Sequence, residues 1–448
     1  MNGASGFAYD AIDASSQVRL LQADPESLNY SLKTFDLSDL PLLHFIAISH
    51  VWGSAMDSQD IYDITVDDRT FCVRKNLYDF LVTCNNKGVG GLLFIDAICI
   101  DQLNVAERRD QVKQMARIYR SADLVIAWLG VPTPRDQRAV DLFSQEHNTA
   151  TRYPRLGAKQ WYGFRYLSYH PYWSRVWIVQ EVLFARNLTV WCGRHIFPSS
   201  LFMGIPSDAI PEPGQRFSTD RRPQTAVNAV SGSRSPAEQI MMHRDQTMLR
   251  TAVAPLSPGA NVAAIAEILR NIRDPHTLVE SYPAPEPDPL HEVIRLFGKH
   301  NCADPRDKLY GFLGLIAASS RAGVDPDYSR DITYAYDQAL KLGLEEIHNE
   351  YAATHHPIKP RDAYAKYLAY YFNQSFEVLR GVVLRIRIEA QHAVRYDWRQ
   401  GDIPRGDANP AVFDCLQVLL GISKTKPKED KTMADNGRGS RRWFCDLA

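Results

Sequence analysis

This sequence lacks the features that assign a function most directly. It has neither a Gly-x-Gly-x-x-Gly loop nor a Walker-type Gly-Lys-Ser/Thr loop, the glycine-rich patterns that mark many nucleotide phosphate sites. Its formal net charge is only -1, which creates no general field for attracting nucleic acid or an anionic membrane. No apolar run approaches the ~20 residues that a membrane-spanning helix needs. We therefore expect neither a nucleic-acid-binding protein nor a membrane span.

Secretion signals and metal-ligand patterns are scarce as well. The first residues show no basic region followed by an apolar region, so no signal peptide is predicted. The 7 cysteines are odd in number and scattered, which is typical of reduced thiols rather than of a disulfide framework. Cys192 and His195 could supply two metal ligands, but no second pair lies nearby. We expect a cytoplasmic protein with no metal and no bound cofactor.

Composition divides the chain, whose 448 residues are enough for more than one domain. Residues 1–200 carry most of the strand-like runs and are expected to form an α/β domain. Residues 201–260 include the Pro-, Ser-, Gly- and Arg-rich stretch Pro206–Pro236 and are expected to be a linker or mobile insertion. Residues 261–423 look mainly helical, and the polar tail 424–448 is predicted to be disordered.

Three apolar runs predict buried strands that are neighbours in one sheet. These runs are Ile46–Val51, Leu92–Ile95 and Leu124–Leu129. The last two, with a helix between them, span about 40 residues, and such a unit is a parallel crossover. The N-terminal part is therefore expected to be α/β with a mainly parallel sheet.

The crossover helix has a clear start and a clear buried face. Asn104 is placed to cap it, and Glu107 is placed to bond back to the Asn104 amide as in a capping box. Apolar residues at helical spacing, among them Val112, Met115 and Tyr119, predict the face that packs on the sheet. We expect a helix from about residue 105 to 121.

Shorter signals predict the remaining elements. A strand is expected at 18–21, a hairpin at 64–73 that turns at Asp67 and Asp68, and a helix capped by Asn76. Helices are expected at 262–272, 290–297 and 332–347, and another is expected to start at Asp304-Pro305.

Polar residues follow two of the predicted strands, at the sheet edge where open parallel sheets bind ligands. Ser49 and His50 end one strand, and Asp96 and Asp101 follow another. Glu181 lies in an apolar helical segment, where a carboxylate is costly to bury unless it is used or paired. These residues are candidates for one site.

A structural role is open for each candidate, and the local pattern favours it. Glu181 could pair with Arg175, Asp96 could cap a turn, and Asp101 could order the loop before the next helix. His50 could be a satisfied core histidine. The tryptophans near these residues fit core positions better than stacking sites; they are Trp52, Trp128 and Trp177.

Several long motifs occur together and in a fixed order. They are Phe-Ile-Ala-Ile-Ser-His-Val-Trp-Gly at 45–53, the stretch from Leu92 to Gly130, and Trp-Ser-Arg-Val-Trp-Ile-Val-Gln-Glu-Val at 173–182. With them, roughly the first 195 residues closely resemble the fungal heterokaryon incompatibility (HET) domain family. A family-like stretch, Asp-Pro-Arg-Asp-Lys-Leu-Tyr-Gly-Phe-Leu-Gly-Leu at 304–315, follows downstream.

The resemblance implies a fold and a site. HET domains are similar to Toll/interleukin-receptor (TIR) domains, so a TIR-like or flavodoxin-like sheet flanked by helices is expected, followed by the helical C-terminal region. In TIR domains that cleave NAD, the glutamate of a Trp-Cys-x-x-Glu segment is catalytic. Glu181 has the same spacing from Trp177, with Ile178 in place of the cysteine. The resemblance thus makes Glu181 catalytic and NAD a substrate. The surrounding substrate-binding candidates are Ser49, His50, Trp52, Asp96 and Asp101.

The resemblance also implies a biological role. It predicts non-self recognition and programmed cell death, with another protein as the trigger or incompatibility partner. Two alternatives to NAD cleavage stay open. The first is a non-enzymatic module that signals by assembly, including assembly with its own copies. The second is an accessory or regulatory protein of a fungal biosynthetic pathway.

Overall fold

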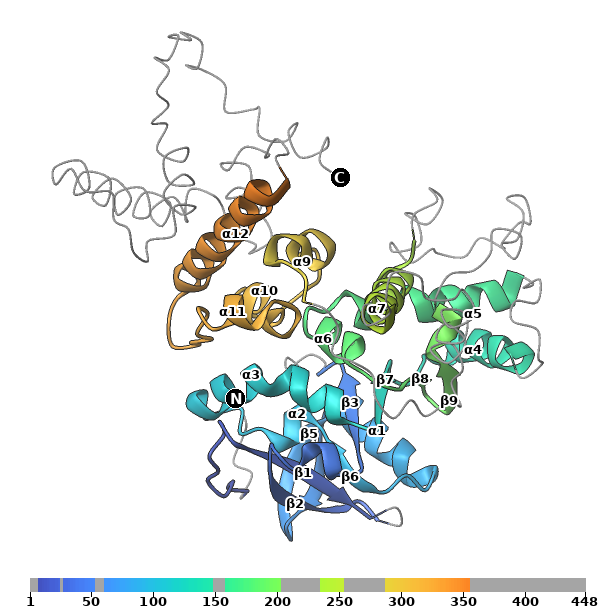
Figure 1. Cartoon of the computed structure of the whole chain (residues 1–448). Coiled ribbons are helices and arrows are strands. Elements are labelled where there is room, and N and C mark those ends of the chain that lie inside the picture. The colour runs from blue at the N-terminus through green and yellow to red at the C-terminus, as the bar shows by residue number, and fades with distance from the viewer. Residues whose placement is uncertain are drawn as a thin grey trace, which may run out of the picture.

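The computed structural model describes residues 7–24, 27–52, 60–147, 158–202, 234–253 and 287–354 (Figure 1). Within these residues the protein has one sheet of nine strands, in the order β5-β4-β2-β1-β6-β3-β7-β8-β9. The strands are β1 (Gln17–Ala23), β2 (Asn29–Asp36), β3 (Phe45–His50), β4 (Ile61–Val66), β5 (Arg69–Arg74), β6 (Gly91–Phe94), β7 (Leu124–Trp128), β8 (Leu188–Cys192) and β9 (His195–Pro198).

The helices lie between and after these strands. Those joined to the sheet are α1 (Lys75–Asn86), α2 (Asp96–Cys99), α3 (Val105–Ser121), α4 (Pro134–His147), α5 (Ala158–Ser168) and α6 (Trp177–Leu183). Those that follow it are α7 (Pro236–Val253), α9 (Leu290–Phe297), α10 (Asp307–Tyr310), α11 (Ala318–Arg321) and α12 (Ile332–Thr354). Single 3-10 turns include η3 (Pro171–Ser174) and η7 (Leu313–Leu315).

The sheet is mixed, and β2 and β4 form a further parallel pair outside its centre, so the prediction of a mainly parallel sheet holds in part. Strands β6, β3, β7 and β8 run parallel to one another. The other pairings include the antiparallel hairpins β1–β2 and β4–β5 and the antiparallel contact of β1 with β6. Short connections allow antiparallel pairing without a crossover helix. Asp67 and Asp68 make the predicted tight turn, with φ of 48° and 59°, the left-handed geometry of a hairpin turn.

The three predicted buried strands are confirmed as neighbours. β3 lies between β6 and β7, with Ala47 opposite Phe94 on one side and Val125 on the other. The four parallel strands lie in the sheet in the order β6-β3-β7-β8. Numbered along the chain, this order is second, first, third and fourth, which is how flavodoxin-like sheets begin. The assignment to that fold, or to a TIR-like fold, stays a prediction.

Helix α3 forms where the sequence predicts it, and its buried face includes Val112, Met115 and Tyr119. The Asn104 side chain accepts a hydrogen bond from the Glu107 amide, as an N-cap does. The prediction that Glu107 bonds back to the Asn104 amide is wrong, because the Glu107 carboxylate pairs with Arg19 on β1 instead. A charge-assisted hydrogen bond from a buried guanidinium stabilises a carboxylate more than a hydrogen bond from a backbone amide does.

The two faces of the parallel strands carry different helices. Phe80 of α1 packs on Trp128, with ring centroids 5.6 Å apart. The neighbouring residue pair, Ser49 and Ala127, must point to the opposite face because side chains alternate along a strand. That face is covered by α6, which contacts β3, β7 and α3. Asn76 does not cap α1, which begins at Lys75; its amide instead donates to the Val51 carbonyl.

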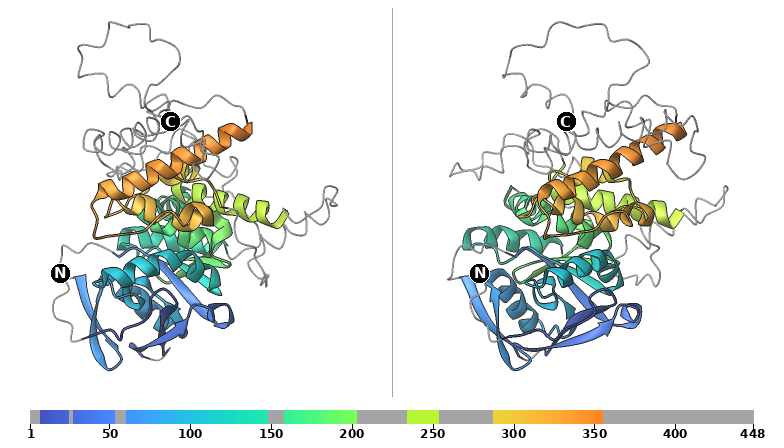
Figure 2. Two further views of the ribbon diagram at one scale, coloured as in Figure 1. Left: turned by 60° about the vertical axis from the view of Figure 1, so that its left-hand side comes forward. Right: turned by 90° about the vertical axis from the view of Figure 1, so that its left-hand side faces the viewer.

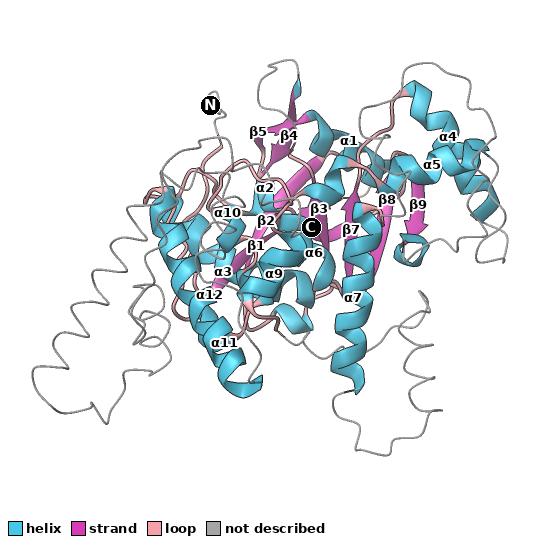
Figure 3. Cartoon of the chain, turned by 90° about the horizontal axis from the view of Figure 1, so that it is seen from above, coloured by secondary structure: helices cyan, strands magenta, loops and turns pink. Residues whose placement is uncertain are grey.

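The helices of the C-terminal part form a further layer beyond α3 and α6. Both views in Figure 2 place α9 and α12 on the far side of these helices from the strands. Figure 3, seen along the stacking direction, shows α6, α9 and α12 in front of the sheet. The predicted helices at 290–297 and 332–347 are confirmed as α9 and α12.

Some predictions on domain division lie outside the described residues. They include the helix at 262–272, Pro206–Pro236 except for its last three residues, and the tail 424–448. Within the range 201–260, residues 236–253 form helix α7. Arg244 on α7 donates to the carbonyl of Val182, in the last turn of α6, and to that of Ala185, just after the helix. The division into domains stays a prediction.

Candidate functional site

A buried contact joins the end of β3 to helix α6. The Ser49 hydroxyl donates a hydrogen bond to the Glu181 carboxyl group, across 132 residues of chain. The Tyr172 hydroxyl oxygen, from η3, lies 2.5 Å from Ser49 Oγ. When Ser49 donates its single proton to Glu181, the Tyr172 hydroxyl is the donor in the second bond. All three side chains are buried, which makes this a continuous internal chain of hydrogen bonds.

The contact lies at the topological switch point of the parallel strands. The chain leaves β3 to form β6 on one side and then crosses to β7 on the other side. Ser49 and His50 are the last two residues of β3. In open α/β sheets, ligands bind at the carboxyl ends of the strands where the strand order reverses. The predicted convergence of Ser49, His50 and Glu181 at this edge therefore matches their positions.

Burial changes the charge state of Glu181. Loss of solvent raises the pKa of this carboxyl group to about 8, and the negative charge of Asp96 acts in the same direction. The Ser49 hydrogen bond and the Arg175 charge oppose the shift but do not cancel it. Glu181 is therefore mainly protonated at neutral pH. In that form it can donate a proton or a hydrogen bond, whereas only its ionised form could stabilise a positive charge.

His50 and Asp96 form a second group on the other side of the strand end. Their closest atoms, His50 Nδ1 and Asp96 Oδ1, are 3.7 Å apart. That separation allows an ion pair, but burial lowers the pKa of His50 to about 4 and keeps it neutral at pH 7. The same distance is too long for a hydrogen bond, and the buried Nδ1 has no partner within the described residues. Trp52 completes the group by donating its indole N–H to Asp96 Oδ2 over 2.9 Å.

Arg175 links the two groups without pairing with Glu181. Its guanidinium donates to the carbonyl oxygen of His50. Its positive charge lowers the pKa of Glu181 and of His50, but within the described residues it forms no ion pair with the Glu181 carboxyl. The structural alternative of a Glu181–Arg175 pair is therefore wrong in its contact, although the two groups do interact electrostatically.

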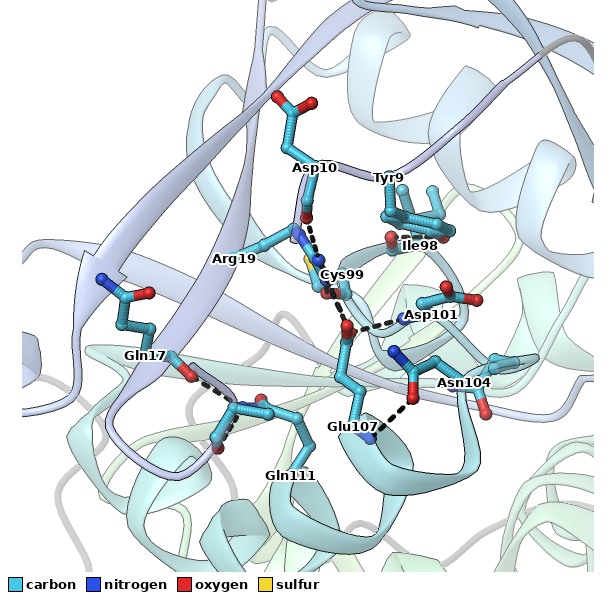
Figure 4. Close-up of polar contacts among 12 residues, drawn as sticks. Tyr9, Asp10, Gln17, Arg19, Ile98, Cys99, Asp101, Asn104, Glu107 and Gln111 are labelled. Atoms are coloured by element: carbon cyan, nitrogen blue, oxygen red, sulfur yellow. Dashed lines mark hydrogen bonds and ion pairs between the residues drawn. The ribbon is translucent and has the colours of Figure 1, made fainter. Parts of the chain in front are cut away.

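Asp101 is not brought into this site. Its carboxylate accepts from the Leu103 amide, and its own amide donates to Glu107 Oε1 over 2.7 Å. Figure 4 shows Asp101 beside the buried ion pair of Arg19 and Glu107, whose closest atoms are 2.6 Å apart. Asp101 thus orders the loop before α3, which is the structural alternative that the sequence left open.

Two tyrosines at the site were not predicted. Tyr172 carries no signal in the sequence, because its partner Ser49 is 123 residues away in the chain. Tyr119 was expected only as part of the apolar face of α3, yet its hydroxyl also donates to the Ile48 carbonyl over 3.0 Å. Burial raises the pKa of both hydroxyl groups well above the ordinary range, so both remain donors.

Metal ligation finds no support at Cys192 and His195. Cys192 is buried, and this burial raises the pKa of its thiol to about 12. His195 Nε2 lies 2.5 Å from Asp141 Oδ1. Across the part of the chain that the structure describes, no cluster of three or more His, Cys, Asp or Glu side chains is arranged to hold a metal ion. Nor does any helix in that part combine the length and apolarity needed to cross a membrane.

Comparisons with known proteins identify the same region. Residues 45–181 match the family "Heterokaryon incompatibility protein (HET)". The "Heterokaryon incompatibility protein 6, OR allele" of Neurospora crassa is 33% identical over 161 residues, which are 31% of this chain and 23% of that protein. The similarity thus spans less than a quarter of the relative's length. No solved structure matches the chain. The stretch from the first residue of β3 to Glu181 on α6 is therefore the part of this chain that matches the heterokaryon incompatibility family.

Proposed function

We propose that this protein acts in heterokaryon incompatibility, the fungal process named in the matched family and in the N. crassa relative. The supporting observation is that the matched region, residues 45–181, begins at β3 and ends at Glu181. It therefore contains both halves of the buried Ser49–Glu181 contact. Recognition would take place in the cytoplasm, with another protein as trigger and programmed cell death as the outcome.

We further propose that the described conformation serves recognition and assembly rather than open catalysis. Glu181 is only 4% exposed and Ser49 is 0% exposed, so a substrate has no direct access to either side chain. The bond between them ties α6 to the sheet instead. A trigger protein, or a second copy of the chain, would then act on the surface formed by these elements.

The test is inducible expression of the full chain in a filamentous fungus. Strains with different natural incompatibility alleles are paired, and death of fused cells is scored with a vital dye. We expect death in some pairings and normal growth in others. The Glu181→Gln variant should change the response, whereas Glu292→Gln, on a partly exposed ion pair with Arg295, should not. Accumulation of the protein with no death in any pairing would contradict the proposal.

NAD cleavage is a second candidate function. It is favoured by one observation, a carboxyl group at the carboxyl edge of parallel strands with TIR-like spacing from Trp177. It also requires two changes, namely loss of the Glu181 proton and exposure of the side chain. If the ionised form is needed, nicotinamide release should rise as the pH passes about 8. Glu181→Gln should then lower the rate by roughly two to three orders of magnitude, as for other electrostatic contributions of 3–4 kcal/mol. Absence of nicotinamide release between about pH 6 and pH 9 would exclude this candidate.

The finer fold assignment is also a proposal. The order of the parallel strands, β6-β3-β7-β8, supports a flavodoxin-like or TIR-like origin of the matched region. The antiparallel strand β9 follows where a further parallel strand would continue that order. An experimental structure of the full chain would test this assignment through the pairing of the strands.

A further inference from the structure

We propose that residues 301–315, which we call the clasp, position helix α6 and thereby hold Glu181 against Ser49. The clasp begins 120 residues after the end of the family match at Glu181. In the described structure it packs on α6 and α3 through α10 and η7. Three separate sets of contacts support this inference. They lie at the entry into the helix, at its first turn and at Gln180.

The first set holds the entry into α6. Asn301 forms a parallel β-bridge with Arg175. The Val176 amide donates to the Asn301 carbonyl over 3.0 Å, and the Asn301 amide donates to the Ser174 carbonyl. These backbone bonds set the path of the chain immediately before the helix. They also set the position of Arg175, whose guanidinium reaches the His50 carbonyl.

The second set holds the first turn. Trp177 donates its indole N–H to Asp307 Oδ2 over 3.0 Å. Tyr328 donates to the other oxygen of the same carboxyl group over 2.8 Å. Asp307 is buried, at 8% exposure, so losing either bond would leave a polar group without a partner in an apolar environment. Trp177 therefore contacts the clasp, and Glu181, one turn later on the same face of the helix, contacts Ser49 on β3.

The third set consists of two hydrogen bonds made by the Gln180 side-chain amide. Gln180 donates through Nε2 to the Gly311 carbonyl over 2.7 Å and accepts through Oε1 from the Gly314 amide over 3.2 Å. The clasp approaches so closely that neither position has room for a side chain. A Cβ at Gly311 would lie 2.4 Å from Val176 Cγ1, and one at Gly314 would lie 2.2 Å from Gln180 Oε1.

Helix α6 needs such support because it is short. It has 7 residues, and its N-cap residue Val176 provides no side-chain hydrogen bond. Helices of fewer than ~12 residues are marginal in water, so their position depends on packing. Gln180 and Glu181 are adjacent, about 100° apart around the helix axis. The clasp therefore holds the flank of α6 next to the one from which Glu181 reaches the end of β3. Gln180 and Asp307 are positioning residues in this arrangement.

The protonation of Glu181 reports whether α6 is in place. Its raised pKa depends on burial, on Asp96 and Arg175, and on the hydrogen bond from Ser49, with Tyr172 next in the chain. Infrared difference spectroscopy of the full-length protein can follow the carbonyl band of a protonated carboxylic acid. The Glu181→Gln variant assigns that band. The readout needs no incompatibility activity, so its result is independent of the proposed function.

Two clasp variants and one matched control test the proposal. Gly314→Ala introduces overlaps with Gln180 on α6 and with Ala116 on α3. Gln180→Met removes both bonds without adding bulk. Gly323→Ala is the control, because the nearest atom to its Cβ would be 3.6 Å away. We expect a titration midpoint of about 8 in the wild type and the control. In both clasp variants it should fall by roughly one unit or more as water reaches the carboxyl group.

The outcomes separate cleanly. An unchanged midpoint in folded Gln180→Met overturns the proposal, because α6 would then hold its position without the clasp. An equal fall in Gly323→Ala also overturns it, because the effect would reflect general loosening. If Gly314→Ala does not fold, the Gln180→Met midpoint decides. The Asp307→Asn variant gives an independent check, since it weakens only the contact with Trp177 and Tyr328 and should shift the midpoint in the same direction.

Discussion

Two buried glutamates in the same α/β region have opposite environments. Glu107 is 5% exposed and Glu181 is 4% exposed, so burial does not distinguish them. Glu107 faces Arg19, which binds both of its carboxylate oxygens at 2.6 and 3.2 Å. Glu181 faces the hydroxyl of Ser49, with no cation paired to it in the described residues, and its pKa is raised. A fully paired carboxylate is explained by folding alone. A buried acid without a counter-charge has a cost that packing does not explain.

The largest effect is expected at the paired glutamate. Arg19→Met keeps most of the apolar volume of the side chain but leaves the Glu107 charge buried without a partner. Breaking a buried pair in this way costs about 3–5 kcal/mol. Chemical denaturation should show a correspondingly lower unfolding midpoint at pH 7. The double variant Arg19→Met with Glu107→Gln should recover part of the loss. A single variant as stable as the wild type would remove the contrast between the two glutamates.

The second effect is a pH dependence of the free energy of unfolding that arises from the titration of Glu181. The folded protein holds its proton up to about pH 8, whereas the unfolded chain releases it near 4.5. This group therefore stabilises the fold fully below pH 4.5, and the stabilisation is lost as the pH rises through about 8. Between these values the free energy of unfolding should fall by up to about 1.4 kcal/mol per pH unit relative to Glu181→Gln.

Measuring both proteins cancels the opposite contribution of His50, whose pKa is lowered to about 4. Stability curves for wild type and Glu181→Gln that run parallel from pH 5 to 8 would show that Glu181 is ionised and paired after all. The two buried glutamates would then be alike.

The third effect concerns the Ser49 hydroxyl, which forms hydrogen bonds with both Glu181 and Tyr172. Ser49→Ala removes the bond to Glu181 and leaves the Tyr172 hydroxyl without its acceptor. Unsatisfied buried polar groups cost about 1–3 kcal/mol. The pKa of Glu181 should rise further, because the Ser49 bond lowers it in the native protein. Denaturation and infrared titration of the same variant test both results. A lower Glu181 pKa in Ser49→Ala would contradict the assigned donor.

The smallest effect is expected in the second group, around Asp96. Trp52→Phe keeps the aromatic ring but loses the 2.9 Å indole bond to Asp96. A partly buried bond of this kind contributes about 0.5–1.5 kcal/mol. Thermal unfolding of the variant should show a small decrease. A loss larger than that of Ser49→Ala would mean that the Asp96 side, not the Glu181 side, is the more tightly coupled part of the site.

The elements predicted from sequence share one property, which is that their signals are local. Local signals predicted the apolar strands β3, β6 and β7 and the capped, amphipathic helix α3. Their hydrophobic period and capping residues lie within a few residues of one another. The Ser49–Glu181 contact could be anticipated because Ser49 ends a parallel strand, where open sheets bind ligands, and Glu181 is a carboxylate in an apolar helical segment. Resemblance to the HET family predicted the region that the comparisons later matched.

Partner choice between distant segments could not be predicted in the same way. Glu107 had a valid local partner in the Asn104 amide, but Arg19 on β1 offered a stronger one. The antiparallel contact of β1 with β6, one of the pairings that make the sheet mixed, joins strands far apart in the chain. Nothing in the local sequence distinguishes Asp101, which orders a loop, from Asp96, which faces His50.

The sequence by itself determined strands β3, β6 and β7, the β4–β5 hairpin, helix α3 with its Asn104 cap and packed face, and the family resemblance. Only the tertiary structure decided which buried acid is paired with a cation, because that depends on whether a residue such as Arg19 lies across the fold. It also decided that the clasp packs on α6, since two glycines and one glutamine form a contact only when chain segments 131 and 134 residues apart meet. Local propensity acts within a few residues, whereas desolvation and pairing depend on neighbours that folding brings together.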